Sequence, residues 1–145
     1  MKKIIIASAF VLGIISFGLA QEKAIIQDTK APKLVFEKTQ HDFGSIEEGT
    51  QATIQFKFIN KGNADALLTS VKASCGCTTP KWTKEPIPPG GEGYITAIYN
   101  SRGRPGNFVK TITVKSNSQN GTDHLTIKGF VKTMPKEPTS PVINN

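Results

Sequence analysis

Two cysteines separated by one glycine, Cys75-Gly76-Cys77, form the spacing in this sequence that most clearly suggests chemistry. A disulfide requires Cα atoms about 4.4–6.8 Å apart, which residues two positions apart reach only where the chain bends. Gly76 makes that bend easy, because glycine accepts backbone angles that other residues resist. So short a loop removes little entropy from the unfolded chain, and the bridge would stabilise weakly. The first interpretation is therefore a local disulfide with a modest structural role.

Two chemical alternatives for the cysteine pair stay open. A strained, exposed bridge is easily reduced, which favours thiol–disulfide exchange. In an extended stretch, side chains two residues apart share a face, and two thiolates on one face suit Cu(I) or zinc. A structural zinc site needs about four ligands, however, and the only histidines, His41 and His124, are far apart in sequence. We expect no bound cofactor.

Gly76 and Trp82 form the context of the cysteine loop, and the two histidines have local structural interpretations. Trp82 follows Cys77 by five positions, and we expect it to pack as core over the cysteine loop, because tryptophan is largely buried on average; an exposed contact role is the alternative. We expect His41 to make local hydrogen bonds and His124 to lie at a strand edge. The sequence has neither a Gly-x-Ser-x-Gly motif nor a phosphate-binding glycine loop, so we expect no enzyme.

The elements that would position these residues are short strands. Apolar and polar residues alternate with period two in the segments 34–36, 53–60, 67–73, 93–100, 108–115 and 124–131, separated by turn clusters such as Asn120-Gly121. This pattern predicts an all-β, immunoglobulin-like antiparallel β-sandwich of about seven strands. We expect its core to contain Phe56, Phe58, Ile95, Ile112, Val114, Leu125 and Ile127.

The start of the chain has the pattern of a secretory signal. Lys2 and Lys3 precede an apolar run over 4–20, and Gly18 and Ala20 stand at −3 and −1 of a cleavage site. We expect cleavage after Ala20, which would leave no integral membrane span. A retained anchor is the alternative, because a run of about 17 residues is at the lower limit for a span. The predicted organisation is a signal peptide over 1–20, a flexible linker over 21–32, the sandwich over 33–133 and a disordered Pro-rich tail over 134–145.

Charge and compartment restrict the partners. The net charge is +7, and nearly all of the positive residues are lysines; the only arginines are Arg102 and Arg104. A nucleic-acid-binding protein usually clusters arginines with aromatic residues on one surface. Here the lysines alternate with apolar residues along strands, which is typical of a solvated surface. We expect no nucleic-acid partner and a location in the periplasm, at the cell surface or in the medium; the sequence leaves the oligomeric state open.

Several motifs in order resemble a known family. They are His41-Asp42-Phe43-Gly44, Phe58-Ile59-Asn60-Lys61-Gly62, Ser74-Cys75-Gly76-Cys77-Thr78-Thr79-Pro80, Ile87-Pro88-Pro89-Gly90, Lys115-Ser116-Asn117 and Ile127-Lys128-Gly129. Over Val35 to about Val131 the chain resembles the exported bacterial family called domain of unknown function 1573. The resemblance implies an immunoglobulin-type sandwich related to Hydin-like and major-sperm-protein-like domains. It supplies no activity, so no functional residue is carried over.

The expected function is therefore an exported, non-enzymatic binding or scaffolding module whose partner is another envelope protein. Sandwich domains often present loops or strand edges to partners, and the sequence shows no catalytic set. The alternative is a thiol–disulfide or soft-metal (copper or zinc) handling protein that uses Cys75 and Cys77.

Overall fold

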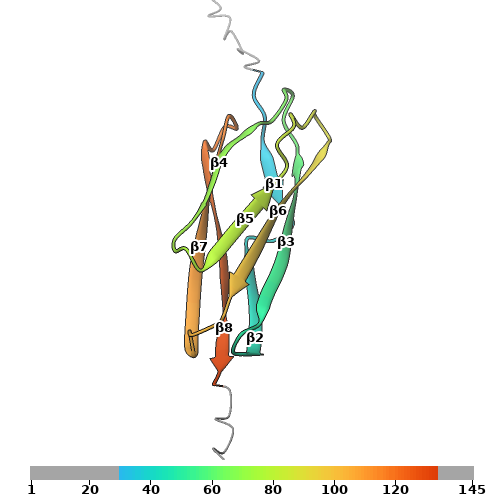
Figure 1. Cartoon of the computed structure of the whole chain (residues 1–145). Helices are drawn as coiled ribbons and strands as arrows, with labels where there is room; N and C mark the ends of the chain where they lie inside the picture. Colours follow the sequence, from blue (N-terminus) through green and yellow to red (C-terminus); the bar gives the residue numbers. More distant parts are fainter. Residues whose placement is uncertain (1–29, 134–145) are drawn as a thin grey trace, which may run out of the picture.

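The computed structural model describes residues 30–133, which contain eight strands and no helix. The predicted signal peptide, most of the predicted linker and the tail over 134–145 lie outside these residues. The all-β prediction is confirmed, and no helix within 30–133 could span a membrane. The strands (Figure 1) are β1 (Leu34–Phe36), β2 (Gln40–Glu47), β3 (Gln51–Asn60), β4 (Leu68–Ala73), β5 (Thr78–Trp82), β6 (Glu92–Asn100), β7 (Gly106–Ser116) and β8 (Thr122–Lys132).

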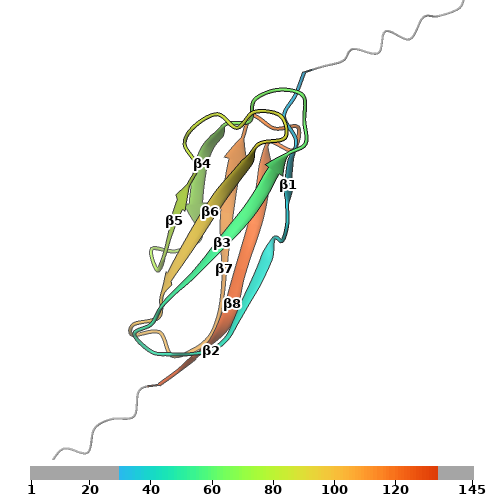
Figure 2. The ribbon, with the colours of Figure 1, turned by 90° about the vertical axis from the view of Figure 1, so that its right-hand side faces the viewer.

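The strands form two four-stranded sheets that pack face to face, as Figure 2 shows from the side. One sheet has the order β1-β3-β6-β5, and the other has the order β2-β8-β7-β4. All pairings are antiparallel except that of β2 with β8, which is parallel. The immunoglobulin-like sandwich is therefore confirmed, with this one parallel pair. It arises because the chain crosses from β1 at one sheet's edge to β2 at the other's, and β2 then runs beside β8 in the same direction.

Two of the eight strands, β2 and β5, have no counterpart among the predicted segments. In β2 the alternation is broken by a shift of register between Asp42 and Ser45. Strand β5 has five residues and contains Pro80. Proline lacks the N–H needed by a strand with neighbours on both sides, but it is tolerated at an edge, and β5 is an edge strand.

The core lies between the two sheets and is built by the inward-facing residues of both. All seven predicted core residues are fully buried: Phe56, Phe58, Ile95, Ile112, Val114, Leu125 and Ile127. Tyr99 of β6 stacks on Phe108 of β7, with ring centroids 4.0 Å apart. This contact joins the two sheets, because β6 and β7 belong to different layers.

One end of the sandwich is organised around the buried side chain of Asn60. Its Oδ1 accepts hydrogen bonds from the backbone N–H groups of Lys33 (3.2 Å) and Gly62 (3.0 Å). Its Nδ2 donates to the carbonyls of Ala64 (2.7 Å) and Ile87 (2.9 Å). Since buried polar groups are costly unless paired, these four bonds explain how an amide is accommodated inside an apolar core. They also hold three separate chain segments together.

The N-terminal contacts of the domain begin slightly before the predicted boundary at residue 33. The N–H of Ala31 donates to the side chain of Asn63 at 2.8 Å. The carbonyl of Pro32 accepts from the N–H of Gln119 at 3.0 Å. The last two residues of the predicted linker are therefore held against the domain.

Truncating the core at Phe56→Ala should lower the free energy of unfolding by about 3–5 kcal/mol, the usual cost of removing a buried phenylalanine. Urea-induced equilibrium unfolding measures this change. The control is Val109→Ala, because Val109 is 64% exposed and surface changes usually stay within about 0.5 kcal/mol. Equal effects of the two substitutions would contradict the assignment of Phe56 to the core.

Candidate functional site

Cys75 and Cys77 are joined by a disulfide in the structure, with Cα atoms 5.3 Å apart. The pair lies between β4 and β5, which are edge strands of different sheets. The bridge is therefore placed where the chain passes from one layer of the sandwich to the other.

The surroundings of the bridge differ between its two sulfurs. Cys77 is only 6% exposed, whereas Cys75 is partly exposed and Gly76 is exposed. The hydroxyl of the buried Thr78 lies 4.0 Å from each sulfur. Cys75 is thus the more exposed residue of the pair, Cys77 is enclosed, and the same hydroxyl lies near both sulfurs.

Backbone hydrogen bonds hold both ends of the cysteine loop. The N–H of Ser74 donates to the carbonyl of Thr111 on β7 at 2.8 Å. The N–H of Asn100 on β6 donates to the carbonyl of Cys77 at 2.9 Å. The loop is therefore attached to both sheets by bonds that do not depend on the disulfide.

The disulfide contributes little to stability through chain entropy. For a loop of three residues the loop-closure relation gives about 1.6 kcal/mol, compared with ~3 kcal/mol for a fifteen-residue loop. The domain has one continuous core of buried apolar side chains, whose burial stabilises the fold far more than the bridge does. The bridge is therefore not required to explain how the domain folds.

Trp82 is partly buried and packs against the core from the end of β5. Thr78 and Trp82 are the two ends of β5 and lie about 13 Å apart along the strand, given a rise of about 3.3 Å per residue. Lys84 Nζ lies 3.1 Å from the centroid of the Trp82 ring, in a cation–π contact. The indole Nε1 of Trp82 is buried without a hydrogen-bond partner in the described part of the chain.

The two histidines are not brought to the cysteines. His41 lies on β2, and β8 and β7 separate that strand from β4, which leads into the cysteine loop. His124 on β8 faces Thr113, with 3.4 Å between its Nδ1 and the threonine hydroxyl. Within residues 30–133, no three His, Cys, Asp or Glu side chains gather as potential metal ligands. Among these described residues, the soft-metal alternative has no third ligand.

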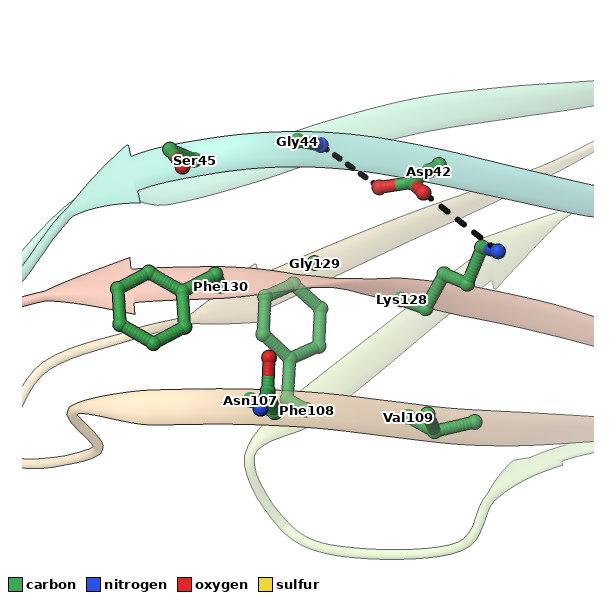
Figure 3. Close-up of a pocket in the computed structure, with 9 residues that line it drawn as sticks. All are labelled: Asp42, Gly44, Ser45, Asn107, Phe108, Val109, Lys128, Gly129 and Phe130. Carbon is green, nitrogen blue, oxygen red and sulfur yellow. Dashed lines mark hydrogen bonds and ion pairs between the residues drawn. The ribbon is translucent and has the colours of Figure 1, made fainter.

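A second candidate site, which the sequence analysis missed, lies on the outer face of the β2-β8-β7 region. It is an open depression of about 410 Å³ (Figure 3). Two exposed large apolar side chains line it, Phe130 at 42% exposure and Val109 at 64%. The other lining residues are Asp42, Gly44, Ser45, Asn107, Phe108, Lys128 and Gly129.

The depression is shaped by a β-bulge in β2. Asp42 pairs with Lys128 and Ser45 with Phe130, so two residues of β2, Phe43 and Gly44, face the single Gly129. A bulge of this kind locally kinks a strand and often lies beside functional surfaces. Gly44 has φ +64°, and a side chain at this position would meet nothing within 4 Å. Because Gly44 has no side chain, the depression stays open at this position.

Gly129 is required by close packing on its inward side. A Cβ there would lie 2.8 Å from two ring atoms of Phe108 and 2.9 Å from the carbonyl oxygen of Gly44. The Phe108 ring thus occupies the space that a side chain at position 129 would need. The bulge and the ring both approach β8 at the same glycine.

A charge pair lies at one end of the depression. Asp42 accepts a hydrogen bond from the Gly44 N–H at 2.8 Å, and its other oxygen lies 3.5 Å from Lys128 Nζ. The Gly44 hydrogen bond, with help from Lys128, lowers the pKa of Asp42. Burial, together with the nearby Lys38, lowers the pKa of His41, against an opposing effect of Asp42. Asp42 therefore stays ionised and is already paired.

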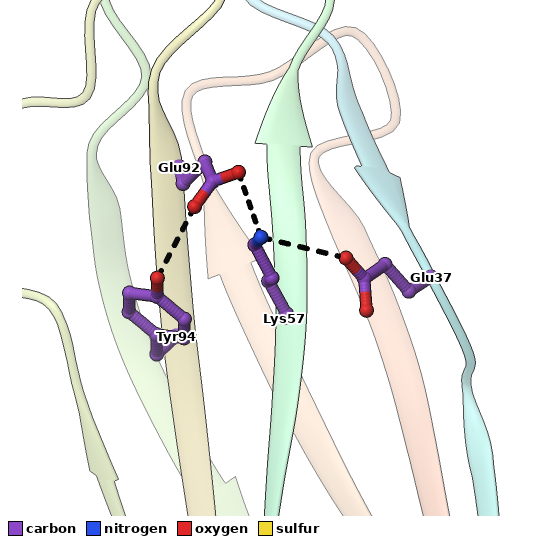
Figure 4. Close-up of polar contacts among 4 residues, drawn as sticks. All are labelled: Glu37, Lys57, Glu92 and Tyr94. Carbon is purple, nitrogen blue, oxygen red and sulfur yellow. Dashed lines mark hydrogen bonds and ion pairs between the residues drawn. The ribbon is translucent and has the colours of Figure 1, made fainter.

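A polar cluster on the outer face of the other sheet has a structural explanation (Figure 4). Lys57 Nζ lies 2.7 Å from Glu92 and 3.7 Å from Glu37, and the Tyr94 hydroxyl donates to Glu92 at 3.2 Å. The bond to Glu92 raises the pKa of Lys57, and the same bond lowers the pKa of Glu92. These residues link the neighbouring strands β3 and β6 and the end of β1.

One residue of the sequence, Gly129, indicates unusual packing at the depression, although the alternation of apolar and polar residues alone does not show it. Leu125, Ile127 and Val131 face inward, and Gly129 interrupts this row. An interior glycine in a strand often marks a bulge or a close approach of neighbouring atoms. The apolar Phe130, next to it on the outer face, adds an exposed aromatic ring.

The substitution Gly129→Ala should destabilise the domain by about 1–3 kcal/mol, because overpacking forces rings and backbone to shift. Denaturant unfolding measures the loss. In the Phe108→Leu background, the additional cost of Gly129→Ala should be smaller, since the ring has been removed. Strict additivity of the two substitutions would contradict the proposed competition for one space.

The Lys57–Glu92 pair predicts a pH dependence. Because the pKa of Glu92 is lowered in the folded state, its stabilisation is present above its unfolded pKa and is lost as pH falls through the folded value. Lys57→Met should therefore reduce stability at neutral pH, and this difference from wild type should shrink in acid. Denaturation midpoints at several pH values measure it, with the exposed Lys81→Met as control. A difference that stays constant into acid would refute the assignment.

Comparison with solved structures places the domain among known sandwiches. A protein of unknown function from Porphyromonas gingivalis W83 is similar with a TM-score of 0.62 and 15% identity, over 75% of this chain and 51% of that one. The chain thus spans about half the length of that protein. The ASH/PapD-like domain 7 of human CEP192 is similar with a TM-score of 0.61 and 10% identity, over 92% of this chain and 100% of that domain.

At these identities the similarity concerns the fold alone. The sequence matches none of the curated proteins with which it was compared. The model of the family described as "Protein of unknown function (DUF1573)" matches residues 34–131, which is nearly the whole described domain. The match, together with the immunoglobulin-like sandwich and the resemblance in its motifs, establishes that this chain belongs to the DUF1573 family.

Proposed function

We propose that this protein is an exported, non-enzymatic binding module that holds a segment of another envelope protein in the depression on β2, β8 and β7. The observation that carries the proposal is that two exposed apolar side chains, Phe130 and Val109, line the same depression. Among residues 30–133 only four large apolar side chains are exposed, between 38% and 64%, and two of the four lie in this depression.

Exposed apolar side chains that gather in one place favour binding. Single apolar residues on a surface need no explanation, but grouped ones mark interaction sites. Aromatic residues such as Phe130 are typical of interface cores, where a small number of buried anchors supplies most of the affinity. The ion pair of Asp42 and Lys128 at the rim provides polar groups for a partner backbone.

The shape of the site favours a polypeptide over a small molecule. Small-molecule pockets usually bury 70–90% of their ligand, whereas this depression lies open on the face of a sheet. A partner protein can place one apolar side chain in the hollow and cover the surroundings with its own surface. The occupant we propose is therefore an apolar anchor residue on a protein segment.

The composition of the depression also supports a role without catalysis. Its one carboxylate, on Asp42, is engaged by Gly44 and Lys128. Its one side-chain hydroxyl, on Ser45, has no histidine beside it in the lining. A nucleophile requires a base within hydrogen-bond reach, and the lining offers no such pair.

Export rests on the signal pattern over 1–20, and the cysteine pair agrees with it. Disulfides form and persist mainly in oxidising compartments such as the periplasm and the cell exterior. The Cys75–Cys77 bridge is the kind of feature expected there.

The test is capture from native envelope extract by the immobilised protein. Phe130→Ser and Val109→Ser should each weaken capture of the specific partner about 5–30-fold, corresponding to ~1–2 kcal/mol for an interface anchor. Affinity is then measured by titration with the isolated partner. The matched control is Val35→Ser, which removes a similarly exposed apolar residue from β1 on the other sheet.

Two outcomes would refute the proposal. Capture that persists when Phe130 and Val109 are both replaced would show that the partner binds elsewhere. Self-association that disappears in Phe130→Ser, without any captured partner, would identify a second copy of this chain as the occupant. Thermal unfolding of each variant confirms that binding is compared between folded proteins.

A further inference from the structure

We propose that the Cys75–Cys77 disulfide is a thiol–disulfide exchange site in which Cys75 Sγ is attacked by an external thiolate and Cys77 leaves. This inference goes beyond partner binding and concerns a different part of the molecule. It rests on three observations: the anchoring of the loop, the unequal exposure of the two sulfurs, and the position of the Thr78 hydroxyl.

The first observation is that the loop does not need the bridge to hold its position. Ser74 is bonded to Thr111, and Asn100 is bonded to the carbonyl of Cys77. Reduction breaks the sulfur–sulfur bond but leaves both of these bonds in place. The two thiols therefore stay close together after reduction, and re-formation of the bridge requires no refolding. This is the property that a reversible redox pair needs.

The second observation is the asymmetry of the pair. Cys75 is partly exposed and follows the exposed Ser74, while Cys77 is 6% exposed. Exchange begins when a thiolate reaches a disulfide sulfur, so access selects the sulfur that is attacked. An incoming thiolate reaches Cys75, and the enclosed Cys77 becomes the leaving group.

The third observation is a buried hydroxyl placed between the sulfurs. Thr78 is 4% exposed, and its Oγ1 lies 4.0 Å from each sulfur. A hydroxyl can rotate to donate its proton to whichever acceptor is stronger, and a thiolate accepts more strongly than a disulfide sulfur. The Thr78 hydroxyl is thus positioned to stabilise Cys77 as it leaves, and a better leaving thiolate accelerates exchange.

The chemical step balances as follows. A thiolate RS⁻ forms a bond to Cys75 Sγ, the Cys75–Cys77 bond breaks, and its electron pair goes to Cys77, which takes a proton from solvent. A second thiolate then attacks the R sulfur of the mixed disulfide and releases Cys75 as a thiolate. Two thiols are oxidised to one disulfide, and the protein disulfide is reduced to two thiols. The co-reactant is therefore a thiol or dithiol.

The first experiment equilibrates the protein, purified from the envelope of producing cells, with mixtures of reduced and oxidised glutathione. Thiols are trapped by alkylation and counted by mass spectrometry. We expect the midpoint of the titration, where half of the molecules are reduced, to fall within the range of these mixtures. Structural disulfides stay oxidised there, because their potentials lie below the glutathione range. A bridge that stays fully oxidised in every mixture would overturn the proposal.

The second experiment assigns the roles of the two sulfurs with single-cysteine variants. In Cys77→Ser the remaining Cys75 should react with oxidised glutathione roughly tenfold faster than Cys77 does in Cys75→Ser, because exposure controls access to the thiol. Equal rates, or a faster Cys77, would overturn the assignment of Cys75 as the attacked sulfur.

Thr78→Val, which keeps the shape and removes the hydroxyl, tests the third observation. It should slow reduction of the bridge by glutathione several-fold while leaving the urea midpoint of the oxidised protein nearly unchanged. An unchanged rate of reduction would remove Thr78 from the mechanism. The matched control is Thr79→Val, at the exposed neighbouring position.

The double variant Cys75→Ser/Cys77→Ser separates chemistry from structure. It should fold, with only a small shift of its urea midpoint, and lose all exchange with glutathione. Failure of this variant to fold would show that the bridge is a structural requirement and would overturn the proposal. Capture of the envelope partner through Phe130 should be unaffected in the double variant, so the two proposals fail independently.

Discussion

The absence of a side chain at Gly129 is the constraint on which the arrangement of β2, β7 and β8 depends. The Phe108 ring fills the inward space at this position, and the carbonyl of the Gly44 bulge closes on it from β2. Phe108 in turn stacks on Tyr99 of the opposite sheet. One glycine thus connects the packing between layers to the bulge that hollows the outer surface. The packing of the core and the shape of the proposed recognition face therefore both depend on Gly129.

The two proposed sites lie at different edges of the sandwich, and the topology explains why. The chain changes sheets at five connections, among them those from β1 to β2 and from β4 to β5. The crossing from β1 to β2 delivers β2 to the side of β8, where the bulge forms. The crossing from β4 to β5 contains the cysteine loop. The bulge interrupts the β2–β8 ladder, and the cysteine loop lies in the connection between two edge strands, so the backbone departs from regular pairing at both places. Both candidate sites are associated with these departures, while the continuous ladders β3–β6 and β7–β8 form the rigid frame.

Much of the fold followed from alternation of apolar residues, because each predicted core position faces a buried layer and burial dominates the choice of register. The cysteine pair was also identified from spacing alone. What could not be predicted depended on three-dimensional neighbours. The bulge at Gly44 breaks the two-residue period, so β2 lacks the pattern by which strands are recognised. The parallel pairing of β2 and β8 depends on which edge the chain reaches after crossing. Gly129 indicates a close approach of neighbouring atoms, but the depression itself is assembled from Asp42, Val109 and Phe130, which come from three strands, so its lining could not be read from the sequence.

The parallel pairing of β2 and β8 has a mechanical consequence. The first and last described residues leave the domain at opposite ends of its long axis (Figures 1 and 2). Tension applied between these ends reaches β8 directly and β2 through β1, and it pulls β2 and β8 along their common direction in opposite senses. The ladder that joins residues 40–47 to residues 126–132 is then loaded in shear, and its hydrogen bonds share the force, whereas a hairpin peeled from its open end breaks its bonds one after another. A domain built this way can resist stretching between its two ends.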